Sequence, residues 1–191
     1  MDRRRPHGVR AGQAAVGRRL RRRHLQPHAY EAESLVEHGA TVVDRPVELA
    51  GRDIVFSMVA ASKDLRQVML DENGLLTDPS SAPRIVADAS TVSVEVSEEV
   101  RAVADARGVG FLAAPVSGNP RVIAAGKLTV VASGPRAVFD EARPLLEAWG
   151  RGVTYAGDGE VARIVKIATT CFWALSSSRC PRSRCLRRRQ V

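Results

Sequence analysis

Long apolar runs and cysteine are scarce in this 191-residue sequence. No stretch approaches the ~20 consecutive apolar residues of a transmembrane helix, so no membrane span is expected. The basic start, from Met1 to Pro6, is not followed by the apolar segment of a secretory signal. The three cysteines stand near the end, no histidine follows Thr169, and their spacing matches no zinc pattern. We interpret them as free thiols of a cytoplasmic chain and predict no metal site.

Lysine is also rare, with three Lys against 26 Arg, and the charges are distributed unevenly. Residues 1–30 hold nine arginines and one acid, residues 163–191 hold eight basic residues and no acid, and residues 31–162 hold 12 basic and 20 acidic residues. The net charge of +8 therefore comes from the two ends. Basic arms can neutralise nucleic-acid phosphates. However, no aromatic residues interleave the N-terminal arginines and no recognition helix or finger is present, so nucleic-acid binding is the least favoured function.

Residues 31–168 alternate short apolar segments with amphipathic ones, which predicts a doubly wound, mostly parallel α/β sheet. The near-continuous apolar run at 53–60 is typical of a parallel strand buried on both faces. Gly39 and Gly108 are expected to end helices, with Ser62 capping one helix and Ser93 or Thr91 the next. The expected strands are 41–44, 53–60, 84–88, 109–113, 128–132 and 150–156, and the expected helices are 31–38, 63–70, 94–107, 136–149 and one that opens at Gly157 and runs through Lys166.

The most informative motif is Phe-Leu-Ala-Ala-Pro-Val-Ser-Gly-Asn-Pro at 111–120, followed by Gly-Lys-Leu-Thr-Val-Val-Ala-Ser-Gly at 126–134. It resembles the D-A-P-V-S-G-G turn of the β-hydroxyacid dehydrogenases, the group of 3-hydroxyisobutyrate dehydrogenase and 6-phosphogluconate dehydrogenase. The resemblance implies that Ser117, Gly118 and Asn119 bind the substrate carboxylate, a role suited to a hydroxyl and free N–H groups. A plain tight turn that needs glycine is the alternative. Ala113 replaces the usual acid and Asn119 the second glycine, which leaves the substrate class open.

Two further segments resemble parts of that family's cofactor site. Ser-Met-Val-Ala at 57–60 ends a strand at the edge of the sheet where cofactors bind. Asp-Ala-Ser-Thr at 88–91 resembles the family's D-x-S-T turn near the nicotinamide. The resemblance implies NADP or NAD as cofactor, contacted by Met58, Val59, Ser90 and Thr91. The alternatives are a core position for Met58 and a helix cap at Ser90 or Thr91, and a cap is compatible with cofactor binding.

Lys166 lies nine residues after Gly157, inside the helix that leaves the domain. In the resembling family a lysine in this register is the general acid/base on the substrate hydroxyl, so Lys166 is the expected catalytic residue. A solvated helix lysine is the alternative. Thr170 stands where the family has the asparagine that partners this lysine.

The two ends do not continue the pattern. A dinucleotide-binding domain begins with an apolar strand and a G-x-G-x-x-G loop, but residues 1–30 contain neither, and only 14–20 resemble the first helix. We hypothesise that both ends are read out of frame. Residues from Thr169 onward, shifted by one base, permit an amphipathic helix with asparagine four residues after Lys166. The expected division is an arginine-rich remnant at 1–30, a Rossmann-like NAD(P)-binding domain at 31–168 and a basic off-frame or disordered tail at 169–191, without the family's all-helical C-terminal domain.

Three functions remain open from the sequence. The favoured one is NAD(P)-dependent oxidation of a β-hydroxyacid, as in 3-hydroxyisobutyrate dehydrogenase, impaired in this chain. The second is a non-catalytic fragment or pseudogene product of such an enzyme, and the third is a basic nucleic-acid-binding protein. The first implies a small hydroxyacid substrate, no membrane partner and a homo-oligomeric parent enzyme.

Overall fold

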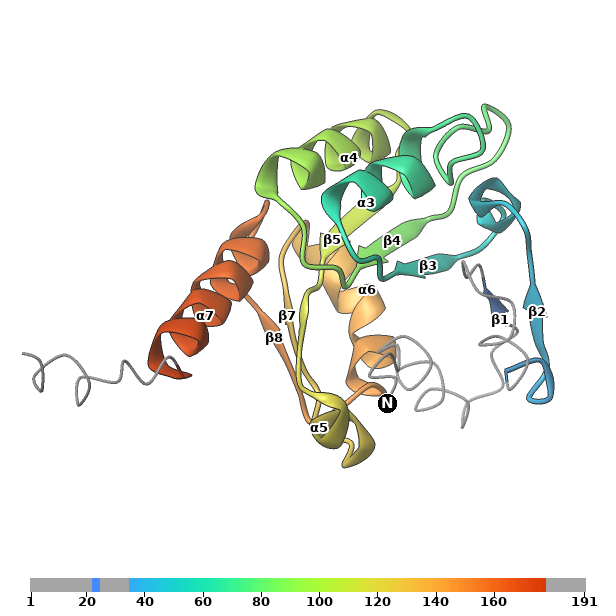
Figure 1. Ribbon diagram of the computed structural model, residues 1–191. Helices are drawn as coiled ribbons and strands as arrows, with labels where there is room; N and C mark the ends of the chain where they lie inside the picture. The colour runs from blue at the N-terminus through green and yellow to red at the C-terminus, as the bar shows by residue number, and fades with distance from the viewer. Residues whose placement is uncertain (1–21, 25–34, 178–191) are drawn as a thin grey trace, which may run out of the picture.

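The computed structural model describes residues 22–24 and 35–177. The expectations for most of 1–30 and for the tail beyond Ser177 therefore lie outside the described residues. Eight strands in three sheets are present in the described parts (Figure 1). They are β1 (Arg22–His24), β2 (Ala40–Val42), β3 (Ile54–Ser57), β4 (Ile85–Asp88), β5 (Gly110–Ala113), β6 (Val116–Ser117), β7 (Thr129–Ala132) and β8 (Gly152–Tyr155).

The strands are mostly parallel, as predicted. β1 pairs with β2 in parallel, β3, β4 and β5 form a parallel sheet in that order, and β7 pairs with β8 in parallel. The end of β5 meets the end of β7 in antiparallel fashion, because Ala113 N donates to Ser133 O (3.0 Å) and Ser133 N to Ala113 O (2.8 Å). β6 continues this antiparallel pairing with β7. The β7–β8 pair therefore runs opposite to β3, β4 and β5, a reversal that apolar patterning alone does not encode.

Helices cover both faces of the central sheet. In Figure 1, α3 and α4 lie over one face and α6 lies against the other, while α7 projects from the body. The helical segments are η1 (Pro46–Leu49), α3 (Ser62–Leu70), α4 (Val94–Ala106), α5 (Pro120–Ala124), α6 (Arg136–Glu147) and α7 (Val161–Ser177). The short elements β6 and α5 were not expected from the sequence. α7 crosses the boundary drawn at residue 168 and continues to Ser177.

The hydrophobic core has two halves, one on each face of the sheet. Ile85 and Ala87 of β4 pack with the α6 side, whereas Val86 between them packs with the side of α3 and α4. This alternation follows from the pleat of a strand, and all of β4 is buried because both faces are covered. Each fully buried large apolar side chain contributes about 1.5–3 kcal/mol. The core members on the helices are Leu65 and Met69 of α3, Val100 and Ala104 of α4, and Phe139, Ala142 and Leu146 of α6.

The predicted helix signals are confirmed at most positions. Gly39 and Gly108 have φ of 84° and 69°, and Ser93 Oγ accepts a hydrogen bond from Val96 N (3.4 Å) as the cap of α4. The prediction for Ser62 is wrong. The cap of α3 is Ala61, whose N–H donates to Asp64 Oδ2 (3.1 Å), and Ser62 Oγ instead accepts from Ser93 N (2.9 Å). Ser62 therefore ties α3 to the start of α4.

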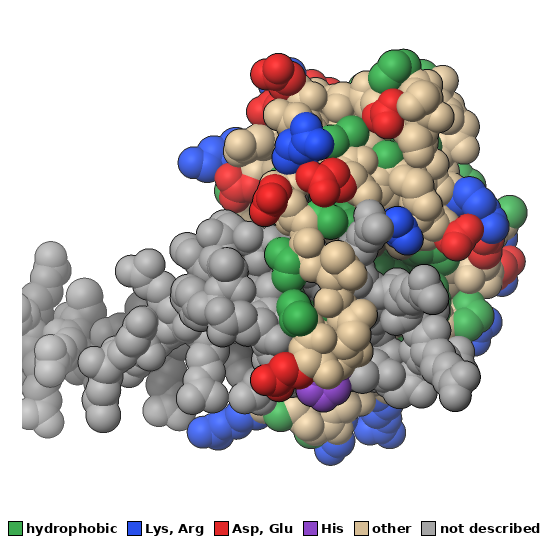
Figure 2. Space-filling view, turned by 90° about the vertical axis from the view of Figure 1, so that its right-hand side faces the viewer, with side chains coloured by type: hydrophobic (Ala, Val, Ile, Leu, Met, Phe, Trp, Pro, Cys, Tyr) green, Lys and Arg blue, Asp and Glu red, His purple; other side chains and the backbone are tan. Residues whose placement is uncertain are grey.

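Charge on the described surface is mixed. On the face shown in Figure 2, Lys and Arg side chains lie interspersed with Asp and Glu side chains. No helix among the described residues is long and apolar enough to cross a membrane.

Candidate active site

The loops that follow β3 and β4 lie side by side at the carboxyl edge of the sheet, where ligands of α/β folds bind. Met58 is 42% exposed there, so the alternative that it is a core residue is wrong. Thr91 is exposed as well, and it does not cap α4 because Ser93 does. Val59 N donates to Ser90 Oγ (2.9 Å), which joins the two loops. The structure thus brings together all four residues that were predicted to contact the cofactor.

Ser90 differs from its three companions because it is buried, at 1% exposure. Its hydroxyl donates to Asp88 Oδ1 (2.7 Å) and accepts from Val59 N. The side chain therefore supports both loops from beneath, and Met58 and Thr91 supply the exposed side chains of this edge. A direct cofactor contact by Ser90 stays a prediction.

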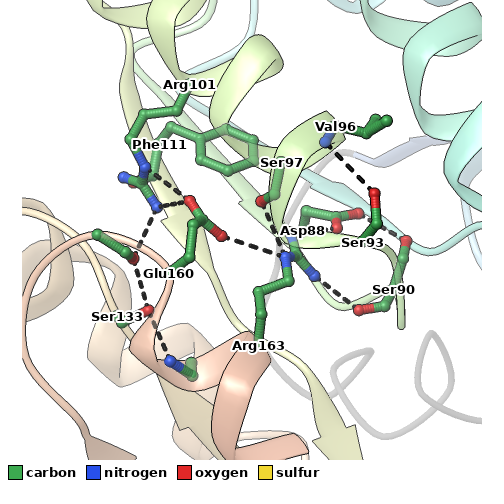
Figure 3. Close-up of polar contacts among 12 residues, drawn as sticks. Asp88, Ser90, Ser93, Val96, Ser97, Arg101, Phe111, Ser133, Glu160 and Arg163 are labelled. Carbon is green, nitrogen blue, oxygen red and sulfur yellow. Dashed lines mark hydrogen bonds and ion pairs between the residues drawn. The ribbon is translucent and has the colours of Figure 1, made fainter. Parts of the chain in front are cut away.

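Asp88 is the buried centre of this support, and none of its surface is exposed. Its Oδ1 accepts from Ser57 Oγ (2.5 Å) and from Ser90, and its Oδ2 pairs with Arg163 Nη2 (2.6 Å) (Figure 3). The sequence indicated Asp88 as part of a turn but gave no role to Arg163. One signal in the sequence could have indicated this role. Arg163 stands among the apolar residues that open α7, and a charged residue in such a position is rarely buried unless it has a partner.

The predicted substrate turn is exposed at the end of β6. Asn119 Oδ1 accepts from Val122 N (3.0 Å), so this side chain caps the short helix α5. Gly118 has no left-handed backbone angle, but a Cβ there would lie 3.0 Å from Leu128 Cδ1 and 3.1 Å from Val122 Cγ1. Both neighbours are ends of side chains, so a residue larger than glycine at this position would require Leu128 and Val122 to shift slightly. Ser117 is the exposed hydroxyl of the turn.

Lys166 is half-buried on α7. Its ammonium forms no ion pair with the described residues. Thr170 Oγ1 donates to the Lys166 carbonyl (2.8 Å), so this hydroxyl bonds the backbone and does not replace the missing amide partner. Among the described residues, no hydrogen bond joins Lys166 to the 117–119 turn, which lies on a different element.

The turn that starts α7 is tightly specified. Gly157 and Gly159 have φ of 112° and 61°, a region that favours glycine. The Tyr155 hydroxyl lies within hydrogen-bond distance of two acceptors, Gly134 O (2.9 Å) and Asp158 Oδ1 (3.0 Å), which share its one proton. Burial raises the pKa of the Tyr155 phenol, and the Asp158 carboxylate acts in the same direction, so the phenol keeps its proton as a donor.

The described residues fit one end of a dinucleotide. The carboxyl edge of β3 and β4 offers an exposed thioether at Met58, a hydroxyl at Thr91 and the backbone of 58–61, a surface suited to a nicotinamide ring and its ribose. The glycine loop that would hold the pyrophosphate was sought in residues 1–30, most of which lie outside the described residues. The glycines there, at positions 8, 12 and 17, do not have the G-x-G-x-x-G spacing.

Comparison with known proteins decides the family. Residues 23–157 match the NAD binding domain of 6-phosphogluconate dehydrogenase. The chain belongs to this family. The matched range of this 6-phosphogluconate dehydrogenase-type domain contains Met58, Thr91 and the 117–119 turn, but it ends before Lys166. The catalytic assignment of Lys166 therefore stays a prediction.

Individual relatives agree with this domain assignment. The chain is 36% identical over 153 residues to 3-hydroxyisobutyrate dehydrogenase of Pseudomonas aeruginosa, covering 80% of this chain and 50% of that protein. It is 34% identical over 144 residues to the NAD-dependent L-serine dehydrogenase of the same organism, covering 75% and 48%. Among solved structures, 3-hydroxyisobutyrate dehydrogenase of Mycobacterium tuberculosis with L-serine matches with a TM-score of 0.78 and 27% identity, covering 88% of this chain and 57% of that chain. The chain thus spans about half the length of these relatives.

Proposed function

We propose that this chain is the cofactor-binding half of an NAD(P)-dependent oxidoreductase that acts on a small β-hydroxyacid. The observation that carries the proposal is the match of residues 23–157 to a nicotinamide-dinucleotide-binding domain, together with the exposed loops at the carboxyl edge of β3 and β4. The names of the relatives, which include 3-hydroxyisobutyrate and L-serine dehydrogenases, support a hydroxyacid as substrate.

Each predicted residue has a defined task in this proposal. Met58, Thr91 and the Val59 backbone hold the nicotinamide end of the cofactor, whose bound form supplies the hydride chemistry. The Ser117 hydroxyl and the N–H groups of the turn hold the substrate carboxylate. Lys166 Nζ, as the neutral amine, accepts the proton of the substrate hydroxyl during oxidation, and the resulting ammonium returns it during reduction.

A second candidate is a chain that binds the cofactor without turning over substrate. Two observations favour it. Thr170 offers no amide to Lys166, and beyond Arg163 the described α7 side chains are exposed except for the half-buried Lys166. The homo-oligomeric parent, the cytoplasmic location and the lack of a nucleic-acid partner stay predictions from the sequence.

Measurements of cofactor binding and of substrate turnover distinguish the enzyme from the second candidate. Trp149 is the useful reporter, because its ring packs on Phe56 of β3 with centroids 4.7 Å apart, and Met58 follows Phe56 by two residues, just beyond the end of β3. We expect NADPH or NADH to quench its fluorescence in a Trp173→Phe variant, where Trp149 is the sole tryptophan. Binding with oxidation of 3-hydroxyisobutyrate or L-serine supports the enzyme, and binding without turnover supports the second candidate.

Absence of binding to either dinucleotide would contradict both candidates. Tight, salt-sensitive binding of DNA by residues 31–168 would instead support the nucleic-acid alternative. A matched pair of variants tests the site itself. Met58→Asp places a carboxylate where the dinucleotide should lie and should weaken binding about tenfold. Ala137→Asp introduces the same charge at an exposed position of α6, on the face of the sheet opposite α3 and α4, and should leave binding unchanged.

A further inference from the structure

Arg163 is the most deeply buried charged side chain of α7, with 1% of its surface exposed. Its guanidinium reaches into the body of the domain and contacts two other elements (Figure 3). Nη2 donates to Asp88 Oδ2 (2.6 Å), Nη1 to Ser90 O (2.7 Å) and Nε to Ser97 Oγ (2.8 Å). These partners lie 75, 73 and 66 residues away in the sequence. One side chain thus joins α7 to the loop after β4 and to α4.

The contacts of Arg163 continue to the proposed cofactor loops. Asp88, which Arg163 pairs with, accepts hydrogen bonds from Ser57 of β3 and from Ser90. Ser90 in turn receives the N–H of Val59. The Arg163 guanidinium is therefore two hydrogen bonds from the loop that carries Met58 and directly bonded to the loop that carries Thr91.

Among the described residues, the other contacts of α7 also lie at or just before its first turn, where Arg101 bonds Glu160 and Gly159 O. Ala162 N donates to Ser133 Oγ (3.0 Å), and no described side chain of α7 beyond Arg163 is buried. From Ile164 to Phe172 every side chain is exposed except the half-buried Lys166. In the described part of the chain α7 is held at its first turn, so the groups in that turn set its orientation, and Lys166 lies less than one turn beyond Arg163.

A purely stabilising role explains this arrangement poorly. Burying an ion pair removes two charges from water, and apolar residues of similar volume often stabilise a fold equally well or better. A planar guanidinium with fixed N–H directions does specify geometry, because each of its bonds restricts the position of a different element. This property suits a joint between a helix and two loops.

We propose that Arg163 is a positioning residue, which sets the place of the Lys166 helix relative to the loops that receive the nicotinamide end of the cofactor. The inference rests on the proposed function for its catalytic meaning. Its structural content, that the guanidinium orders residues 58–61, 89–92 and the first turns of α7 together, is independent of any cofactor.

Amide hydrogen exchange on the full chain, without cofactor, tests the structural content. In Arg163→Lys, which keeps the charge but loses the planar fork, exchange in 58–61, 89–92 and 161–168 should become about tenfold faster, with the middle of α6 unchanged. The double variant Arg163→Met with Asp88→Asn removes both charges and should give the same local pattern with less risk of unfolding. Arg143→Met, which removes an exposed pair with Glu147 on α6, is the matched control and should leave all three segments unchanged.

The same variants are then titrated with NADPH and NADH. Weaker dinucleotide binding by Arg163→Lys than by Arg143→Met, about tenfold, supports the positioning role in the proposed site. If the wild-type chain binds neither dinucleotide, the proposed function fails. The exchange data still show whether Arg163 orders the three segments together. The inference is overturned if exchange rises uniformly over the whole domain, or if the three segments keep their wild-type rates in both Arg163 variants.

Discussion

Asp88 and Glu160 are the two buried carboxylates among the described residues. Asp88 is satisfied by two hydroxyls and Arg163, whereas Glu160 depends on arginine alone. Arg101 Nη2 lies 2.6 Å from Glu160 Oε1, and Arg163 Nε lies 3.4 Å from Oε2. Arg101 also donates to the carbonyls of Phe111 (2.7 Å) and Gly159 (3.0 Å). Arg101 therefore holds the turn that starts α7 against β5.

Removal of Arg101 should destabilise the fold strongly. Arg101→Met leaves Glu160 buried without its main partner, and breaking a buried pair in this way typically lowers the free energy of unfolding by about 3–5 kcal/mol. Arg66→Met is the control, because the Arg66–Glu99 pair is exposed on α3 and α4, and such pairs contribute roughly 0–1 kcal/mol. Urea unfolding of both variants measures the difference. Equal losses would show that the Glu160 pair does not stabilise the domain.

At the scale of the element, the connection from α6 to β8 shows how backbone approach selects glycine. A Cβ on Gly150 would lie 2.1 Å from Leu128 O, whereas a Cβ on Gly152, two residues later, would meet no heavy atom within 4 Å. The difference arises because the chain turns under the start of β7 at Gly150 and then pairs with it along β8, where Gly152 lies opposite Thr129.

This pair of glycines gives a sharp comparison. Gly150→Ala forces the chain away from Leu128 and should lower the free energy of unfolding by roughly 1–3 kcal/mol, as for other overpacked sites. Gly152→Ala should be neutral or slightly stabilising, because alanine restricts the unfolded chain more than glycine does. Thermal unfolding of the two variants side by side checks this. A similar loss in both would mean that β8 does not approach β7 as described.

Most strands and helix ends were predictable because the sequence patterns that specify them are local. The apolar run at 53–60 contains β3, although the strand spans only Ile54–Ser57 and is not buried on both faces, because Phe56 is 36% exposed. Gly39 and Gly108 lie at helix ends with left-handed backbone angles. The prediction that Ser62 caps a helix was wrong because tertiary contacts determine which partner a serine hydroxyl bonds. Here the Ser62 hydroxyl accepts from Ser93 N. β6 was not predicted because a strand of two residues is too short to show an alternating apolar pattern. Its pairing with β7 is set by the antiparallel bridge between Ala113 and Ser133.

At the scale of the whole molecule, the candidate site was predictable only in part. Met58 and Thr91 follow strands that pair in parallel, so their convergence at one edge follows from the topology. The Arg163–Asp88 joint spans 75 residues, and no local pattern announces a contact of that range. The 117–119 turn and Lys166 belong to different elements, and no hydrogen bond joins them in the described part of the chain, so their joint action on a substrate stays a prediction.

Binding of a reduced dinucleotide at the carboxyl edge of β3 and β4 can be measured by amide hydrogen exchange on the 191-residue chain. Amide exchange is compared with and without saturating NADPH, and again with NADH. We expect slower exchange in residues 58–61 and 89–92 with at least one dinucleotide, and no change in α6, which lies on the face of the sheet opposite α3 and α4. Binding without protection of these two loops, or no binding at all, would contradict the claim that the carboxyl edge of β3 and β4 is a cofactor site.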